Sequence, residues 1–139
     1  MSSVIPLTIK HIEQLGRLNQ QLLEDEGNSK NLSHSYLCQR MRGWLKDANY
    51  FGFGCVIEGQ IAAYILACYE DDFIYVRQLV TDREYRRQGH ASKLLQHIET
   101  YLGSAKQIRL DVLMNNQSAM FFYAKLGFKP FYMAMIKHT

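Results

Sequence analysis

The chain has 139 residues and a mass of 16.2 kDa, with 47% hydrophobic and 21% charged residues. This composition excludes an intrinsically disordered chain and predicts one globular domain over residues 1–139, long enough to bury a core without disulfide or metal supports. A net charge of +3 falls short of the concentrated basic stripe typical of nucleic-acid binding, so no nucleic-acid partner is expected.

The N-terminus has no basic stretch followed by a long apolar run, and no segment approaches about 18 uninterrupted apolar residues. The three cysteines, Cys38, Cys55 and Cys68, are widely spaced and form no CxxC pair, which indicates neither a zinc site nor a disulfide framework. We therefore expect a cytoplasmic protein with no membrane partner and no bound metal.

The first part of the chain predicts a strand and two helices. Residues 4–10 carry β-branched side chains typical of a short strand. Apolar residues recur at helical spacing over residues 12–23 and again over residues 37–45, where Ser33 or Ser35 can provide the N-cap.

Three strands follow in the sequence. Residues 50–58 and 61–69 flank the turn signal Glu58-Gly59-Gln60, which predicts an antiparallel hairpin. An acidic turn then leads into a further strand that begins at Phe73.

The last part of the chain predicts helices and strands in alternation. A helical stripe runs from Ala91 to Leu102, residues 107–113 alternate as a half-buried strand, and Asn115 or Asn116 caps a helix that Gly127 ends. Residues 128–137 then predict a final strand.

The turn between the strand at Phe73 and the helix after it has the features of an anion-binding loop. It reads Arg86-Arg87-Gln88-Gly89-His90-Ala91-Ser92. The first backbone N–H groups of a helix have no partner within the helix, and the helix dipole is positive there. Gly89 permits a positive φ and leaves no side chain between backbone and ligand, while the arginines add positive charge. This stretch therefore predicts a phosphate site.

A second block lies downstream, Asn116-x-x-Ala119-x-x-x-Tyr123-x-x-Leu126-Gly127-Phe128. Together with Arg86-x-x-Gly89-x-Ala91, it resembles the two signatures of the GNAT superfamily of N-acetyltransferases, in the same order. The resemblance covers the chain from about Tyr50 onward with specific residues, and the first half by the order of its elements. It implies an α/β (α+β) fold, with a mixed, mostly antiparallel sheet flanked by about four helices and with strands splayed at the cofactor site.

The resemblance also assigns roles to residues. Acetyl-CoA would bind with its pyrophosphate on Arg86, Arg87, Gln88, Gly89, His90, Ala91 and Ser92 and its pantetheine arm along the backbone of Leu79, Val80 and Thr81. Asn116 would hydrogen-bond the same arm, although a plain N-cap explains it equally well, and small Ala119 would let the cofactor lie against the helix. Tyr123 matches the family's general acid for the departing thiolate.

Three points stay open. Many family members carry a carboxylate on the strand before the loop as a proton acceptor for the amine, but this chain has Arg77-Gln78 there, so the base could be Glu70, Asp72, Glu26 or a water chain. A cysteine could in principle carry the acetyl group, although direct transfer in a ternary complex is preferred. His90 could touch a phosphate or face water.

We expect an acetyl-CoA-dependent N-acetyltransferase that acts on a primary amine of a small molecule or a protein. The acidic segment Glu24-Asp25-Glu26 suggests a cationic acceptor, such as a polyamine or an aminoglycoside. The main alternative is an acyl-CoA-binding regulatory module without turnover. A nucleotide-binding protein is disfavoured because the chain lacks a phosphate-loop motif of the Gly-x-x-x-x-Gly-Lys-Ser/Thr type. The family resemblance makes a homodimer an open expectation.

Overall fold

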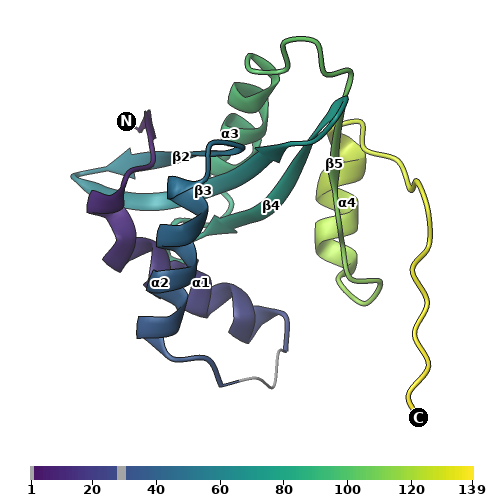
Figure 1. Cartoon of the computed structure of the whole chain (residues 1–139), viewed down its shortest axis with the longest axis horizontal. Coiled ribbons are helices and arrows are strands. Elements are labelled where there is room, and N and C mark those ends of the chain that lie inside the picture. The colour runs from purple at the N-terminus through teal and green to yellow at the C-terminus, as the bar shows by residue number, and fades with distance from the viewer. Residues whose placement is uncertain (1, 28–30) are drawn as a thin grey trace.

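The structure, a computed structural model, describes residues 2–27 and 31–139 as a five-stranded sheet with helices on both faces (Figure 1). The strands are β1 (Ser3–Pro6), β2 (Tyr50–Ile57), β3 (Gln60–Tyr69), β4 (Phe73–Thr81) and β5 (Gln107–Leu110). The helices are α1 (Ile12–Asp25), α2 (His34–Lys46), α3 (His90–Glu99) and α4 (Gln117–Lys125), with short 3₁₀ turns η1 (Ile9–His11) and η2 (Arg83–Tyr85).

The strands lie in the sheet in the order in which they occur in the chain. β1 to β4 pair antiparallel with their neighbours, and β5 pairs parallel with β4. In the turn between β2 and β3, Glu58 and Gly59 have φ angles of 50° and 79°, the two positive values that a tight hairpin needs. The expected mixed, mostly antiparallel sheet with four helices is confirmed.

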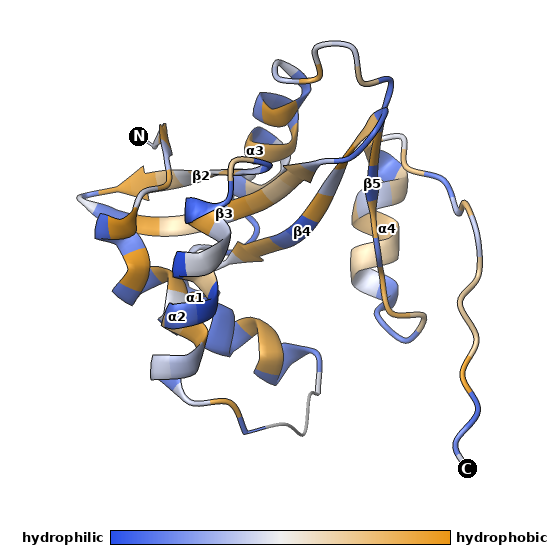
Figure 2. Cartoon of the chain, in the orientation of Figure 1, coloured by the Kyte–Doolittle hydropathy of each residue, from blue (hydrophilic) through white to orange (hydrophobic). Residues whose placement is uncertain are grey.

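Each face of the sheet has its own hydrophobic core. The central strands that lie between the two cores carry long apolar stretches, coloured orange in Figure 2. On one face α1 and α2 pack through Leu15, Leu18 and Met41 against Tyr64 and Leu66 of β3. On the other face Leu94, Leu95 and Ile98 of α3 pack against alternate residues of β3 and β4. Because β3 is covered on both sides, eight of its consecutive residues are buried, from Ile61 to Cys68.

Two details at the N-terminal end resolve or correct the sequence expectations. The first strand ends at Pro6 rather than at residue 10, because residues 9–11 form the turn η1 instead. Of the two candidate caps for α2, Ser33 is the one used: its hydroxyl accepts a hydrogen bond from the N–H of Tyr36 at 3.1 Å.

The prediction of a final strand over residues 128–137 is wrong for this chain. Apart from the N–H of Phe128, which bonds back to Tyr123, the segment makes no hydrogen bond in the described structure and runs away from the sheet (Figure 1). Its side chains have strand character, but a strand exists only where a second strand pairs with its backbone. We refer to residues 129–139 as the C-terminal arm.

None of the helices in the described ranges combines the length and the apolar character needed to cross a membrane.

Candidate functional site

β4 and β5 part halfway along β4 and leave a strand fork. Their pairing runs from Phe73 opposite Gln107 to Val76 opposite Leu110 and ends there. β4 continues to Thr81 paired only with β3, so its other edge has no strand partner among the described residues over residues 77–81. Figure 1 shows the two strands diverging from their shared start. The fork exposes backbone N–H and C=O groups of β4 at which an extended ligand can pair.

A β-bulge at Arg77 marks the point where the fork opens. Gln78 lies opposite Leu66 and Val76 lies opposite Ala67, so Arg77 is the extra residue on β4. Bulges bend a strand and increase its twist, which accounts for the divergence of β4 from β5. The splayed strands implied by the family resemblance are therefore present.

The anion loop, residues 86–92, follows β4 after the turn η2. Gly89 is the N-cap of α3 with φ of 83°, and Arg87 also has a positive φ of 64°. In the described structure no acceptor is bonded to the backbone N–H groups of residues 87–92, and the first amide of this region to be bonded is that of Lys93, to Gly89 O. A Cβ placed on Gly89 would have no protein atom within 4 Å. The loop therefore presents a row of free amides at the positive end of a helix, in open space.

Three side chains of the loop contact the protein itself, among them Gln88, whose Oε1 lies 3.4 Å from Nε2 of His90. The imidazole of His90 is buried and lies edge-on to Tyr85, at 6.5 Å between ring centroids, so the side chain does not face water as one interpretation of the sequence had it. The guanidinium of Arg86 donates to Thr81 O at 3.3 Å and forms an ion pair with Asp25 at the end of α1. Arg87 and Gln88 are exposed, and Ala91 and Ser92 are half-buried. The free charge of the loop is thus that of Arg87.

The predicted residues of α4 lie after the other branch of the fork. Asn116 is the N-cap of α4, and its side-chain oxygen accepts from Ala119 N at 3.2 Å and from the Ser118 hydroxyl at 3.3 Å. The capping interpretation of Asn116 is confirmed, while the side-chain amide of Asn116 remains free to donate. Ala119 is half-buried one turn further on.

Tyr123 lies at the edge of the core that α3 covers. Its ring packs between Phe122 and Phe128, with centroid distances of 5.2 and 5.5 Å, and its hydroxyl has no hydrogen-bond partner in the part of the chain that the structure describes. Burial raises the pKa of Tyr123 to about 12. The Tyr123 hydroxyl is therefore protonated throughout the neutral pH range and can donate a hydrogen bond.

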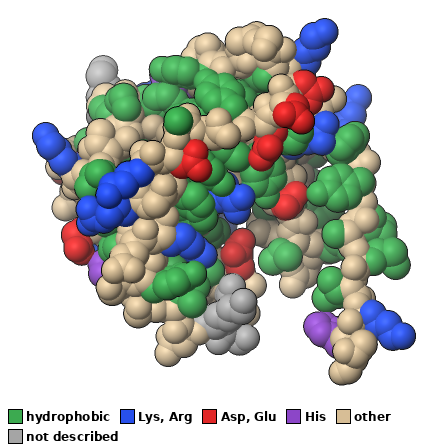
Figure 3. Space-filling view, viewed as in Figure 1, with side chains coloured by type: hydrophobic (Ala, Val, Ile, Leu, Met, Phe, Trp, Pro, Cys, Tyr) green, Lys and Arg blue, Asp and Glu red, His purple; other side chains and the backbone are tan. Residues whose placement is uncertain are grey.

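The parallel pairing of β4 and β5 brings the predicted residues to one end of the sheet. The anion loop follows the carboxyl end of β4, and Asn116 follows the carboxyl end of β5, the strand that pairs parallel with β4. Leu79, Val80 and Thr81 belong to the unpaired edge between them, with the side chain of Val80 buried in the core. On the face drawn in Figure 3, an open hollow separates the part that carries α1 and α2 from the part that carries α4.

Sequence reasoning missed a pair of residues at the mouth of the fork. The Tyr75 hydroxyl donates to the carboxylate of Asp111, the residue after β5, at 2.9 Å. Burial, and after it the hydrogen bond to Asp111, raises the pKa of Tyr75 to about 12. The strand pattern placed Asp111 only on the polar side of a strand. Its proximity to Tyr75 depends on the pairing of β4 with β5, which no local pattern reveals.

Around Arg77 lies a group of aromatic rings that we call the aromatic face, formed by Trp44, Tyr50 and Tyr75. The Arg77 guanidinium lies 5.5 to 5.7 Å from the three ring centroids and donates to the Tyr50 hydroxyl at 2.8 Å. Glu70 reaches the same side of the sheet, where its carboxylate lies 3.7 Å from the thiol of Cys68. Asp72 lies in the turn before β4 and accepts a hydrogen bond at its carbonyl from Lys106 N.

The acidic segment at the end of α1 is largely neutralised. Arg83 donates to Glu24 at 3.0 Å and to Asp25 at 3.3 Å, and Asp25 also pairs with Arg86. Partial burial of the Glu26 carboxyl, and after it the charge of Asp25, raises the pKa of this carboxyl. Because two of the three carboxylates already have cationic partners, this segment gives little reason to expect a polycationic acceptor.

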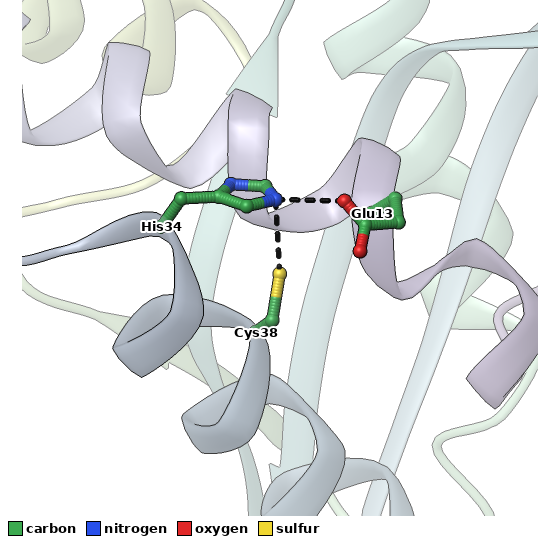
Figure 4. Close-up of side chains that lie close together, drawn as sticks. All are labelled: Glu13, His34 and Cys38. Atoms are coloured by element: carbon green, nitrogen blue, oxygen red, sulfur yellow. Dashed lines mark hydrogen bonds and ion pairs between the residues drawn. The ribbon is translucent and has the colours of Figure 1, made fainter.

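Glu13, His34 and Cys38 form the one group of three potential metal ligands that converge within the described residues, with their ligand atoms within 4.8 Å of one another (Figure 4). Glu13 Oε2 lies 2.8 Å and Cys38 Sγ 3.4 Å from the same atom, Nε2 of His34. One nitrogen cannot donate to the carboxylate and accept a proton from the thiol at the same time, so the trio is not a nucleophile–base relay. The hydrogen bond between Glu13 and His34 and the one from the Cys38 thiol to Ile12 O give each of the three side chains a partner within the protein.

Comparisons with known proteins agree with this geometry. A family model described as "Acetyltransferase (GNAT) family" matches residues 16–128, which is most of the chain. No curated protein sequence matches the chain.

Solved structures share the fold at low sequence identity. A possible acetyltransferase from Clostridium difficile 630 is 21% identical with a TM-score of 0.85, covering 100% of this chain and 97% of its own. An aminoglycoside N-acetyltransferase, AAC(6')-Iy in complex with CoA, is 13% identical with a TM-score of 0.83, covering 100% and 95%. A ribosomal-protein-alanine N-acetyltransferase from Brucella melitensis is 10% identical with a TM-score of 0.79, covering 100% of both chains. The fold is thus shared by proteins named for very different acceptors.

Proposed function

The chain belongs to the GNAT acetyltransferase family, and we propose that it transfers the acetyl group of acetyl-CoA directly to a primary amine of a small molecule or a protein. Acetyl-CoA is the acetyl donor used by GNAT acetyltransferases. The observation that carries the proposal is the row of amides over residues 87–92 that have no acceptor among the described residues, placed at the end of a strand whose outer edge has no described strand partner over residues 77–81.

The residues present fit acetyl-CoA. The amides of the anion loop and the Arg87 side chain would hold its diphosphate, since both are exposed and offer donors and positive charge. Arg86 supports the loop through Asp25 and Thr81. The edge of β4 at residues 79–81 offers backbone groups to the amides of the pantetheine arm. Bound in this way, acetyl-CoA supplies an activated acyl thioester.

Tyr123 is our candidate for stabilising the departing thiolate. A phenol with a pKa of about 12 holds its proton more tightly than a thiol with a reference pKa of about 8.5, so complete proton transfer from the phenol is uphill. Donation of a hydrogen bond to sulfur as negative charge develops has no such cost. We therefore assign Tyr123 the role of a hydrogen-bond donor in the transition state.

The proton of the incoming amine needs an acceptor, because an alkylammonium with a pKa of about 10.4 is more than about a thousandfold protonated at neutral pH. Asp111 is our first candidate, since it lies at the mouth of the fork and is held by Tyr75. Glu70 is the second, on the side of the sheet that carries the aromatic face. Each would receive the proton directly or through water.

Direct transfer is favoured over an acetylated cysteine. Cys38, Cys55 and Cys68 are all buried. Burial raises the pKa of each of the three thiols, which disfavours the thiolate needed for attack.

The proposal is tested by measuring release of free CoA thiol with a panel of amines that includes polyamines, aminoglycosides, amino acids and peptide N-termini. Because Arg77 occupies the aromatic face, the panel must contain acceptors with a carboxylate or phosphate as well as cationic ones. Acceptor-dependent release supports the enzyme. Tight binding of acetyl-CoA without release for any amine would instead support the regulatory module.

A further inference from the structure

The guanidinium of Arg77 is fixed against the aromatic face, although the residue is exposed. Arg77 is the extra residue of the bulge and the first residue of β4 beyond its pairing with β5. Its guanidinium lies 5.5 to 5.7 Å from the ring centroids of Trp44, Tyr50 and Tyr75, and its Nε donates to the Tyr50 hydroxyl at 2.8 Å. Contact with the rings and this hydrogen bond together hold the guanidinium at the mouth of the strand fork.

The outer donors of this guanidinium have no acceptor among the described residues. Only Nε of Arg77 is hydrogen-bonded there, so the N–H groups of both Nη atoms are unbonded in this part of the structure. In contrast, Arg17, Arg83 and Arg86 each form an ion pair with a carboxylate. A planar guanidinium that is held in place with unbonded Nη groups is suited to bind a carboxylate or a phosphate through two parallel hydrogen bonds.

A second arginine adds positive charge on the same side of the sheet. The guanidinium of Arg40, on α2, lies 4.9 Å from the ring centroid of Trp44, and its Nη2 donates to Asn19 Oδ1 at 2.9 Å. Over the described ranges no carboxylate, that of Glu70 included, forms an ion pair with Arg40 or Arg77. The aromatic face therefore carries two positive charges without a described counter-ion, which favours a ligand with a negatively charged group.

One side chain connects this positive group to the carboxylate that is our first candidate for receiving the proton of the amine. The Tyr75 ring centroid lies 5.6 Å from the Arg77 guanidinium, and the Tyr75 hydroxyl donates to the Asp111 carboxylate at 2.9 Å. Two groups of opposite charge are thus in contact with a single tyrosine. An acceptor whose amine approaches Asp111 can therefore reach Arg77 with a negative group only a few bonds from that amine.

Resting on the proposed acetyltransferase function, we propose that the acceptor is a small amine that also carries an anionic group, a carboxylate or a phosphate, and that Arg77 binds this group. The neutral amine nitrogen forms the new C–N bond to the acetyl carbon, and the C–S bond of acetyl-CoA breaks. The nitrogen loses a proton to Asp111 and the CoA thiolate takes up one, so CoA is released as the thiol and the anionic group is unchanged. Arg77 is thus a specificity-determining residue that positions the acceptor.

The first test measures release of CoA thiol with matched pairs of acceptors. The anionic members are ω-amino acids of increasing length and aminoalkyl phosphates, and their neutral partners are the corresponding amino amides and amino alcohols. We expect the anionic member of a pair to have a kcat/KM at least about tenfold higher, because hydrogen bonds between charged groups are the strong ones. A preference of this size for either kind of anion supports the proposal, and the better kind identifies the group that the site binds.

The variant Arg77→Gln should remove this preference. It should raise the KM for the anionic acceptors about tenfold or more, and leave the KM for acetyl-CoA and the reaction of the neutral partners nearly unchanged. Arg77→Lys should restore part of the preference, and Arg42→Gln, the same change at an exposed arginine of α2, should behave as wild type. If the neutral partners react as well as the anionic members, or if Arg77→Gln keeps the preference, this proposal is wrong while the acetyltransferase function stands.

A second test measures binding without turnover. Trp44 is the only tryptophan in the chain, so intrinsic tryptophan emission reports on the aromatic face directly. Titration with the same compounds in the presence of CoA should change the emission saturably for the anionic members, in wild type and Arg42→Gln but not in Arg77→Gln. The absence of a saturable change with every anionic compound in wild type would overturn the proposal. Saturable binding without CoA release from any pair would confirm Arg77 as an anion-binding residue and contradict the proposed acetyl transfer.

Discussion

Tyr75 donates a 2.9 Å hydrogen bond to Asp111 and thereby joins β4 to the chain just beyond β5, at the last point before the two strands separate. The bond holds a carboxylate at the mouth of the strand fork. Burial of Tyr75 keeps its hydroxyl protonated, with a pKa of about 12, so Tyr75 acts as donor and leaves the second oxygen of Asp111 available. This is the arrangement expected of a carboxylate positioned to receive a proton.

If Asp111 receives the proton of the acceptor amine, Asp111→Asn should lower kcat about 100-fold, with little change in the KM for acetyl-CoA. The fall in kcat of Asp111→Asn relative to wild type should become larger as the pH is lowered, because a smaller fraction of the acceptor amine is then neutral. Steady-state kinetics over a pH series measures both effects. Glu70→Gln is the matched comparison: if it causes the larger fall in kcat, Glu70 is the base and the assignment to Asp111 is wrong.

The variant Tyr75→Phe tests whether Tyr75 positions the carboxylate of Asp111. It removes the hydrogen bond to Asp111 but keeps the carboxylate, so we expect a smaller fall in kcat than for Asp111→Asn. Equal losses in the two variants would mean that the pair only ties the strands together.

Replacement of Gly89 by alanine should weaken acetyl-CoA binding. Gly89 has φ of 83°, where a Cβ costs about 1–2 kcal/mol. Gly59, with φ of 79° and equally open surroundings, carries the same conformational cost in the turn between β2 and β3. Both variants should lose similar unfolding free energy, but only Gly89→Ala should raise the KM for acetyl-CoA, by roughly tenfold or about 1.4 kcal/mol. If Gly59→Ala raised the KM for acetyl-CoA by the same factor, the effect of Gly89→Ala would be no evidence that the anion loop binds acetyl-CoA.

Tyr123→Phe should reduce kcat about 100-fold and leave the KM for acetyl-CoA nearly unchanged, because the hydroxyl acts only as charge develops on sulfur. Phe122→Tyr is a control for changes in the neighbouring packing and should retain activity. A kcat for Tyr123→Phe within a factor of about two of wild type would show that Tyr123 is only part of the core.

The raised pKa of Tyr123 also predicts how stability depends on pH. Above about pH 10 the unfolded chain releases the proton of this phenol, while the folded chain keeps it to about pH 12. The free energy of unfolding should therefore fall over this interval, by up to about 2–3 kcal/mol for Tyr123 alone. Tyr64 and Tyr75, whose pKa values burial also raises, contribute with the same sign.

Urea unfolding at about pH 9 and about pH 11 measures this fall. Tyr123→Phe should make it smaller, whereas Tyr36→Phe, at an exposed side chain, should leave it as in wild type. An unchanged fall in Tyr123→Phe would contradict the burial of this phenol.

The parts of the site that sequence predicts are those set by local chemistry. A glycine after two arginines and before a helical stripe defines the anion loop within seven residues, and Asn116 caps α4 within four. The local sequence pattern does not determine how distant strands pair or in which register. The bulge at Arg77 and the contact between Tyr75 and Asp111 both depend on register, so the acceptor side of the site could not be predicted.

The arm illustrates the same limit. The apolar residues after Pro130 have the residue types of a strand, but in the described structure no strand pairs with their backbone, so the prediction of a strand over residues 128–137 fails. Likewise, the acidic residues of α1 predict a negative rim until the structure brings Arg83 and Arg86 beside them.

The most direct test of the central claim is a titration of the isotope-labelled chain with acetyl-CoA, followed through its backbone amide resonances. If the anion loop binds the diphosphate, the amides of residues 87–92 should show the largest shifts, and ATP should displace acetyl-CoA poorly. Saturable binding of acetyl-CoA that leaves the amides of Gly89 and its neighbours unmoved would contradict the account.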